Sequence, residues 1–282
     1  MPMAPLDGCG TPWEEGLGMS AGRFDGHLVL VTGGGSGLGE ADAKLFAEEG
    51  AVVIVADIDV ANGERVAGEI GGSATFVRLD VSDETAWQAL MGDIAAKHGR
   101  LDVLVNNAGV SGVSTPESIT GADLKLAWDV SVAGTIYGCK HAIPLLKKSE
   151  HGGAIVNMSS ITAIRGEPFA AAYTAAKGAI SAYTRSLAVY CAQSGIPIRA
   201  NAVLPAAIDT PMVGKFADEF RDRAIQPLRE GREDSVPPVL GHPRDVAALV
   251  AFLASRDARF LSGQSIVLDN TASVTIGSVP AF

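Results

Sequence analysis

A glycine-rich segment at residues 32–39, TGGGSGLG, constrains the fold of this chain more than any other feature. It follows an apolar run at residues 27–32 and precedes residues 36–49, whose apolar side chains recur with helical spacing. Glycine permits tight turns and lets the backbone approach a ligand closely. The start of the following helix offers unpaired N–H groups and the positive end of the helix dipole to an anion. The segment therefore predicts a diphosphate-binding turn between the first strand and the first helix of an α/β fold.

The glycines of this turn have separate expected tasks. Gly33 makes the tight turn out of the strand, Gly37 leaves room for a diphosphate, and Gly39 lets the helix pack closely on the strand. The predicted cofactor contacts of the turn are Gly33, Gly35, Ser36, Gly37, Leu38 and Gly39.

An acidic residue, Asp57, ends the second apolar run at residues 51–56. A carboxylate at this place accepts hydrogen bonds from the adenosine ribose and repels a 2′-phosphate. Because no Arg or Lys stands beside it or at Ser36, the sequence predicts NAD rather than NADP. Asp80 ends the third run, where its carboxylate is expected near the adenine. The predicted contacts at this end of the cofactor are Asp57, Ile58, Asp80 and Val81.

Strand-like and helix-like segments alternate along the rest of the chain. Strands are predicted at 27–32, 51–56, 74–79, 101–106, 153–157, 198–203 and 265–268, and helices at 36–49, 61–70, 85–98, 122–148, 171–194 and 243–254. Continuously apolar strands that alternate with helices indicate a parallel sheet covered on both faces. We therefore expect a single-domain α/β Rossmann fold, a doubly wound and mostly parallel seven-stranded sheet with helices on both faces.

Composition excludes several other classes of protein. Hydrophobic residues make up 47% of the 282 residues, which argues against disorder, and a net charge of −10 argues against nucleic-acid binding. The cysteines, Cys9, Cys139 and Cys191, are too few and too scattered for a disulfide framework or a zinc site. No uncharged apolar run is long enough to cross a membrane. These features predict a cytoplasmic protein with reduced thiols and no metal.

Two segments stand apart from the regular pattern. Residues 1–22 hold three prolines and are expected to form a flexible N-terminal arm, or else to contact a neighbouring subunit. Residues 23–282 are expected to form one catalytic domain. Residues 210–241 carry four prolines and many charges, which also fits a solvated insertion, but their place after a strand end favours a mobile substrate lid.

Tyr173 and Lys177 begin the apolar pattern at residues 171–194 and stand four residues apart. Residues at this spacing share one face of a helix. A nearby ammonium favours the phenolate, so Lys177 is expected to lower the pKa of Tyr173 and make it an acid/base. Alone, such a pair would be interpreted as a surface pair on a helix; its presence in a chain with a cofactor turn favours catalysis.

These motifs together resemble the short-chain dehydrogenase/reductase family. The resemblance rests on TGGGSGLG at residues 32–39, NNAG at residues 106–109, Ser159 and Ser160 after a strand, and Tyr173-x-x-x-Lys177, and covers about residues 23–268. It implies that one Rossmann domain holds both the cofactor and the substrate. It also implies a homodimer or homotetramer that pairs through the helices at residues 122–148 and 171–194.

The resemblance assigns roles to further residues. Tyr173 is similar to the family's general acid/base, Lys177 to the lysine that holds the nicotinamide ribose, and Ser160 to the serine that binds the substrate oxygen, with Ser159 as the alternative. The expected nicotinamide-side contacts are Asn107, Ala108, Gly109, Tyr173, Lys177, Pro205, Ile208 and Thr210.

The sequence departs from the family pattern at one expected catalytic position. Ser131 stands in the V-N-x-x-G pattern where the family has an asparagine that supports a water in the proton relay. A serine cannot supply the amide, so the relay is less certain than the hydride step. Ala206 in place of a glycine, and Asp269-Asn270-Thr271 in place of D-G-G, remove no reacting group.

The expected function is hydride transfer between NAD(H) and a secondary alcohol or ketone at a Ser-Tyr-Lys site. Phe169 and Met212, with Ser160 and Tyr173, are the expected substrate contacts and favour an apolar substrate. The main alternative is a dinucleotide-binding sensor or structural subunit with impaired catalysis. A sugar-nucleotide epimerase or dehydratase resembles a longer chain, and an enoyl-type reductase resembles a wider Tyr–Lys separation.

Overall fold

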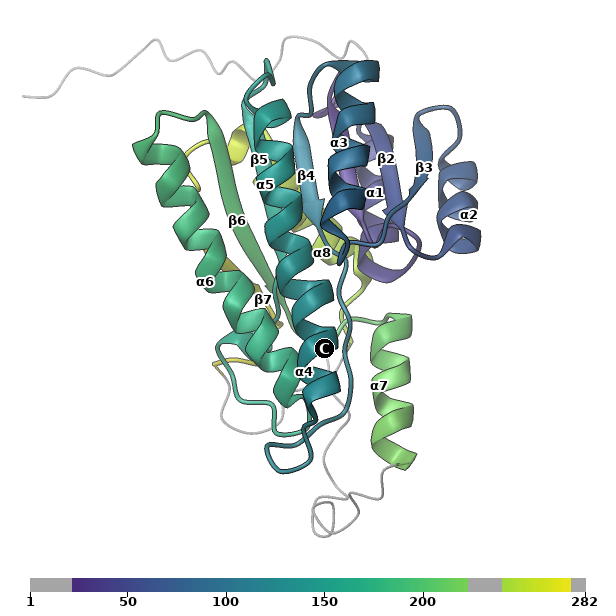
Figure 1. The fold of residues 1–282 in the computed structure, drawn as a ribbon, viewed down its shortest axis with the longest axis vertical. Coiled ribbons are helices and arrows are strands. Elements are labelled where there is room, and N and C mark those ends of the chain that lie inside the picture. The colour runs from purple at the N-terminus through teal and green to yellow at the C-terminus, as the bar shows by residue number, and fades with distance from the viewer. Residues whose placement is uncertain (1–21, 223–239, 275–282) are drawn as a thin grey trace, which may run out of the picture.

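The computed structural model describes residues 22–222 and 240–274. Within them, seven parallel strands form one sheet in the order β3-β2-β1-β4-β5-β6-β7 (Figure 1). The strands are β1 (Leu28–Thr32), β2 (Val52–Asp57), β3 (Ala74–Arg78), β4 (Val103–Asn106), β5 (Gly153–Met158), β6 (Ile198–Pro205) and β7 (Ser265–Leu268). The helices are α1 (Gly37–Glu48), α2 (Val60–Ile70), α3 (Glu84–His98), α4 (Gly121–Ala127), α5 (Gly134–Leu146), α6 (Ala171–Gln193), α7 (Pro211–Asp222) and α8 (Pro243–Ala254).

This architecture confirms the predicted Rossmann fold. Each predicted strand coincides with an observed strand to within two residues at its ends, and the sheet is wholly parallel rather than mostly so. The predicted N-terminal arm lies outside the described residues except for Gly22, and residues 223–239 of the predicted lid also lie outside them.

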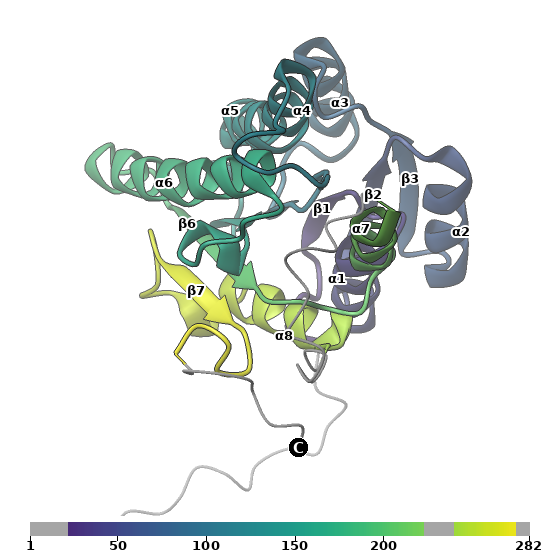
Figure 2. The same ribbon diagram turned by 90° about the horizontal axis from the view of Figure 1, so that it is seen from below.

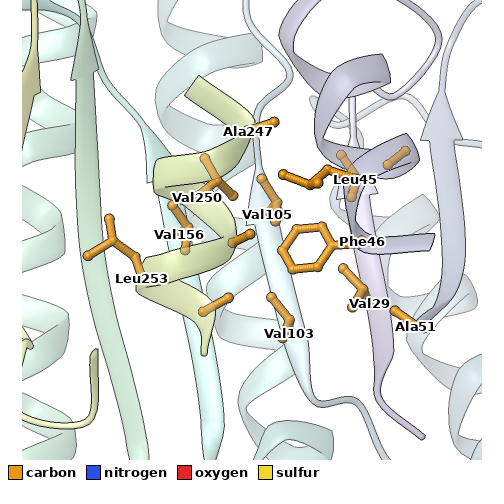
Figure 3. Close-up of a cluster of buried hydrophobic side chains, with 14 of the residues drawn as sticks. Val29, Leu45, Phe46, Ala51, Val103, Val105, Val156, Ala247, Val250 and Leu253 are labelled. Atoms are coloured by element: carbon orange, nitrogen blue, oxygen red, sulfur yellow. The ribbon is translucent and has the colours of Figure 1, made fainter. Parts of the chain in front are cut away.

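The sheet is buried on both faces because alternate side chains of each strand enter different apolar clusters. On β1, Val29 and Val31 belong to a cluster with α1 and α8, whereas Leu28 and Leu30 belong to a cluster with α3, α5 and α6. Figure 3 shows the first cluster, in which the fully buried ring of Phe46 lies over β1 and β4 and beside α8. This two-sided burial explains the continuously apolar strands in the sequence.

The helix predicted at residues 122–148 is interrupted. α4 and α5 are separated by a π-helical segment (Trp128–Ala133), in which the chain makes wider turns. The Thr135 hydroxyl donates to the Ser131 carbonyl oxygen at 2.7 Å within this region. Helical spacing of apolar residues continues through the segment, so the sequence pattern does not distinguish it from one helix. π-helical segments are frequent at functional sites.

The order of the strands creates a crevice at their carboxyl ends. The chain runs outward from β1 to β3 and then returns to β4, so the connections after β1 and β4 leave the sheet edge in opposite directions. In both ribbon views α7 lies beyond the carboxyl ends of β1 and β2, near the start of α1 (Figures 1 and 2). Ligands of open parallel sheets bind in such a crevice.

The two described ends of the predicted lid are joined to each other. Ile208 and Gly241 form a parallel bridge, and the Gly241 amide donates to the Ala207 carbonyl at 3.0 Å. The Asp209 amide in turn donates to the Gly241 carbonyl at 2.9 Å. The points at which the predicted lid begins and ends therefore lie side by side next to the crevice.

Candidate active site

A pocket of about 470 Å³ lies at the carboxyl ends of the strands. Most of the residues predicted from the sequence line it: Gly33, Ser36, Gly37, Leu38, Asp57, Ile58, Asp80, Val81, Asn107, Ala108, Gly109, Ser160, Tyr173, Lys177, Pro205, Ile208, Thr210 and Met212. The structure thus brings together predicted residues that lie between positions 33 and 212 of the sequence.

Four predicted residues do not line this pocket. Gly35, Gly39 and Ser131 lie behind its wall, where they shape the backbone or pack against lining residues. Phe169, predicted as a substrate contact, is also absent from the lining. Its carbonyl accepts a hydrogen bond from the Ser114 amide at 2.9 Å, so its backbone pairs with the segment after β4.

Further residues line the pocket that sequence reasoning did not select. They are Leu79, Val110, Leu126, Val130, Met158, Ala206, Pro211 and Val213, while Ser159, the alternative to Ser160, also lines the pocket. Most are aliphatic, and an isolated aliphatic residue gives no functional signal in a sequence. Ala206 and Pro211 adjoin residues that were selected, so position relative to Pro205 and Thr210 was the available signal.

The glycine-rich turn has the conformation its predicted task requires. Gly33 has φ of 63° and Gly37 has φ of 57°, values that residues with a side chain rarely adopt. A Cβ atom on Gly39 would lie 2.2 Å from the Gly33 carbonyl oxygen, so only glycine permits this approach of α1 to the turn. The Ser36 side chain makes no capping hydrogen bond at the start of α1. The first N–H groups of α1 therefore remain available for an anion.

The end of β4 is fastened to this turn by side chains. The Thr32 hydroxyl accepts hydrogen bonds from the Asn107 and Ala108 amides, both at 3.1 Å. The Asn107 side-chain amide donates to the carbonyl oxygens of Thr32 and Gly33, at 3.0 and 3.2 Å. Asn107 thus connects the end of β4 to the glycine-rich turn after β1.

Asp57, which lines the pocket at the end of β2, is held by two backbone amides. One carboxylate oxygen accepts from the Gly35 amide and the other from the Asp59 amide, each at 2.9 Å. Each oxygen keeps acceptor capacity for a ribose hydroxyl. Asp80 accepts hydrogen bonds from the Ser82 amide and hydroxyl, at 3.0 and 2.6 Å.

The structure separates the roles of the two adjacent serines. The Ser159 hydroxyl contacts the Lys177 carbonyl and the Ser181 hydroxyl, both at 2.8 Å, and so joins β5 to α6. The Ser160 hydroxyl accepts from the Thr162 amide at 3.2 Å and makes a hydrogen bond with the Tyr173 side chain. Ser160 is therefore the serine placed beside the phenol.

Tyr173 and Lys177 meet at the floor of the pocket. The buried Lys177 ammonium donates to the Met158 carbonyl oxygen at 2.7 Å and lies 5.4 Å from the centre of the Tyr173 ring. Burial lowers the pKa of Lys177 to about 8. Burial raises the pKa of Tyr173, and the hydrogen bond with Ser160 opposes that rise. The net shift of the Tyr173 pKa in this structure is therefore upward rather than downward as expected, because loss of water around the phenol is its largest cause.

Ser131 lies beside this pair without lining the pocket. Its hydroxyl is fully buried and has no hydrogen-bond partner among the described residues. A Cβ atom on Gly109 would lie 3.3 Å from the Lys177 nitrogen and 3.5 Å from the Ser131 oxygen, so both polar atoms border the space that this glycine leaves.

Comparison with known proteins gives a consistent result over most of the chain. A family model described as enoyl-(acyl carrier protein) reductase matches residues 33–271. Meso-2,3-butanediol dehydrogenase of Serratia marcescens is 38% identical over 90% of this chain and 98% of its own length. A 3β-hydroxysteroid dehydrogenase of Mediterraneibacter gnavus is 35% identical over 89% and 96%. Cyclopentanol dehydrogenase of Comamonas sp. is 36% identical over 88% and 97%.

Proposed function

Because the chain belongs to the short-chain dehydrogenase/reductase family, we propose that it interconverts a secondary alcohol and a ketone with NAD(H). The observation that carries this proposal is the placement of Ser160, Tyr173 and Lys177 in the same pocket as the glycine-rich turn and Asp57. The dehydrogenase relatives support action on a CH–OH group with a nicotinamide dinucleotide. The choice of NAD and the roles of individual residues are our proposal.

Tyr173 is the proposed acid/base. In oxidation its phenolate accepts the hydroxyl proton of the alcohol, and in reduction its hydroxyl returns a proton to the forming alkoxide. Ser160 donates a hydrogen bond to the same substrate oxygen and orients it toward the phenol. A bound nicotinamide supplies the hydride acceptor or donor.

Lys177 and Ser131 complete the proposed catalytic set. The ammonium of Lys177 stabilises negative charge on the Tyr173 oxygen and is positioned to hold the nicotinamide ribose. Since its hydrogen-bond partner in the structure is the Met158 carbonyl, the ammonium keeps donors free for other groups. The Ser131 hydroxyl, which borders the same space, is proposed to support proton exchange at Lys177.

The adenosine end of the pocket supports NAD. The residues proposed to hold the dinucleotide are Gly33, Ser36, Gly37, Leu38, Asp57, Ile58, Asp80, Val81, Asn107, Ala108, Gly109, Pro205, Ile208 and Thr210. Asp57 presents a carboxylate where the ribose is expected, and a 2′-phosphate would bring two like charges together.

The substrate end is aliphatic. Val110, Leu126, Met212 and Val213 line the pocket along with the catalytic residues. The three relatives are named for a diol, a steroid alcohol and a cyclic alcohol, all of which carry a secondary hydroxyl. We propose a secondary alcohol with an apolar body, and we propose that the described part of the predicted lid, residues 210–222, covers it. The lid proposal rests on the first turn of α7, which lines the pocket, and on the joined ends of the insertion.

We propose a homodimer or homotetramer in the cytoplasm. None of the helices in the described residues has the length and apolar character needed to cross a membrane.

A substrate panel tests the proposed function. The full chain is assayed with cyclopentanol, 2,3-butanediol, a 3β-hydroxysteroid and an enoyl thioester, each with the NAD and NADP forms of the cofactor. We expect NAD-linked oxidation of at least one secondary alcohol. Reduction of the enoyl thioester alone would favour the activity in the family model's description, and cofactor binding without turnover would favour the sensor alternative.

A further inference from the structure

The amide and the carbonyl of Gly35 each make a hydrogen bond with a different side chain. The Gly35 amide donates to Asp57 at 2.9 Å, and the Gly35 carbonyl accepts from a guanidinium nitrogen of Arg65 at 3.1 Å. A Cβ atom on Gly35 would lie 2.9 Å from an Asp57 carboxylate oxygen. The same backbone residue therefore connects the acid proposed to bind ribose with a cation of α2.

Arg65 is itself fixed by carboxylates. Its two terminal nitrogens pair with both oxygens of Glu40 on α1, at 2.7 and 3.1 Å, and one of them also pairs with Glu69 at 2.9 Å. Lys44 joins the same two glutamates at 2.6 and 2.7 Å. A two-pronged guanidinium–carboxylate pair fixes direction as well as distance, unlike a single contact between point charges. The guanidinium is thus aimed at the Gly35 carbonyl by α1 and α2 together.

We propose that Arg65 is a positioning residue of the cofactor site, which holds the glycine-rich turn against Asp57 through the Gly35 carbonyl. This inference rests on the proposed dinucleotide binding. Arg65 does not line the pocket and makes no proposed contact with the cofactor. Its effect passes through Gly35 to the turn and to the Asp57 carboxylate.

A surface ion pair elsewhere in the chain provides a matched comparison. Arg244 of α8 pairs with Glu48 near the end of α1 at 2.7 and 3.2 Å, and both side chains are exposed. Exposed pairs of this kind contribute little to stability. Arg244 pairs with a carboxylate on the same helix, α1, as Arg65 does, but within the described residues its side chain makes no hydrogen bond with the glycine-rich turn.

The test compares Arg65→Met with Arg244→Met in the full chain. The dissociation constants of NADH and of ADP-ribose are measured, together with KM for NAD, kcat and the melting temperature. We expect Arg65→Met to raise the dissociation constants of both ligands about five- to tenfold, since it removes one charge-assisted hydrogen bond that fixes the turn. KM for NAD should rise while kcat stays, and Arg244→Met should bind both ligands as the wild type does.

Two further variants keep the proposal open to refutation if Arg65→Met folds poorly. Arg65→Lys retains the charge but not the two-pronged guanidinium, and it should raise the dissociation constant of ADP-ribose by an intermediate factor. Glu69→Gln leaves both the Glu40 pair and the Gly35 contact in place, and it should change this dissociation constant less than twofold. Equal ADP-ribose binding by wild type and the Arg65 variants, or equal losses in Arg65→Met and Arg244→Met, would overturn the inference alone. If the wild type bound none of NADH, NADPH and ADP-ribose, both this inference and the proposed function would be overturned.

Discussion

The Lys177 ammonium lies 5.4 Å from the centre of the Tyr173 ring while it donates a hydrogen bond to the Met158 carbonyl at 2.7 Å. The cation is therefore anchored to the end of β5, and the phenol of Tyr173 lies one turn earlier on α6. Burial raises the Tyr173 pKa, so the hydroxyl is protonated at neutral pH in this structure. The direction of that shift determines how each direction of the proposed reaction should depend on pH.

Oxidation should accelerate as pH rises, because it requires the phenolate of Tyr173. Below the raised pKa the phenolate fraction grows about tenfold per pH unit, so log kcat/KM for oxidation should rise with a slope near one between about pH 6 and 8. Reduction requires the protonated phenol and should change little over this range. Parallel pH profiles in the two directions would contradict the assignment of the proton to Tyr173.

The two adjacent serines should separate chemistry from stability. Ser160→Ala removes the hydroxyl beside the phenol and should lower kcat about 100-fold with little change in melting temperature. Ser159→Ala removes the hydrogen bond to the Lys177 carbonyl and should lower the free energy of unfolding by about 1 kcal/mol while activity remains. Steady-state kinetics and thermal unfolding of both variants measure the contrast, and a larger loss of kcat in Ser159→Ala would reverse the roles.

Asp57→Ala should reduce the preference for NAD. A hydrogen bond to a charged group contributes about 1.5–3 kcal/mol, so the ratio of kcat/KM for NAD to that for NADP should fall about 10- to 100-fold. Asp80→Asn is the control, because Asp80 bonds to Ser82 and is expected at the adenine rather than the ribose. An unchanged ratio in Asp57→Ala would remove Asp57 from the selectivity of the site.

Asp42 on α1 should destabilise the fold at neutral pH. It is fully buried, and neither carboxylate oxygen has a hydrogen-bond partner among the described residues. Burial raises its pKa well above the usual value, so the native state binds a proton more tightly than the unfolded state. Stability is therefore lost as pH rises from about 4, the unfolded pKa, toward the raised native pKa.

Removing this carboxylate should stabilise the protein. Asp42→Ala should raise the free energy of unfolding at pH 7 by about 1–3 kcal/mol, and the gain over wild type should shrink toward pH 4. Chemical denaturation at several pH values measures both effects. A destabilised Asp42→Ala variant with unchanged pH dependence would show that the carboxylate has a partner in solution.

Much of the fold was predictable because local patterns and tertiary structure agree. The apolar runs that predict strands are the runs buried on both faces, and Gly33, Asp57 and Asn107 lie at strand ends that the parallel topology brings to one edge. The π-helical segment around Ser131 was missed, since a wider helical turn leaves the spacing of apolar residues nearly unchanged.

Contacts between residues distant in sequence were the main limit. Nothing local indicates that Arg65 reaches the carbonyl of Gly35, because the contact depends on how α2 packs beside α1. The position of Phe169 depends in the same way on the pairing of its backbone with Ser114. The direction of the Tyr173 pKa shift required knowledge of burial, which the spacing of Tyr173 and Lys177 does not provide.

The central claim is that Tyr173 transfers the proton in an NAD-linked reaction of a secondary alcohol. The most direct measurement is kcat/KM for NAD-linked oxidation of the best alcohol of the panel by wild type and by Tyr173→Phe. The dissociation constant of NADH is measured for both proteins to show that the variant binds the cofactor equally well. The account predicts a loss of about 10²- to 10⁴-fold in the variant, with NADH still bound. Equal kcat/KM in the two proteins would contradict it.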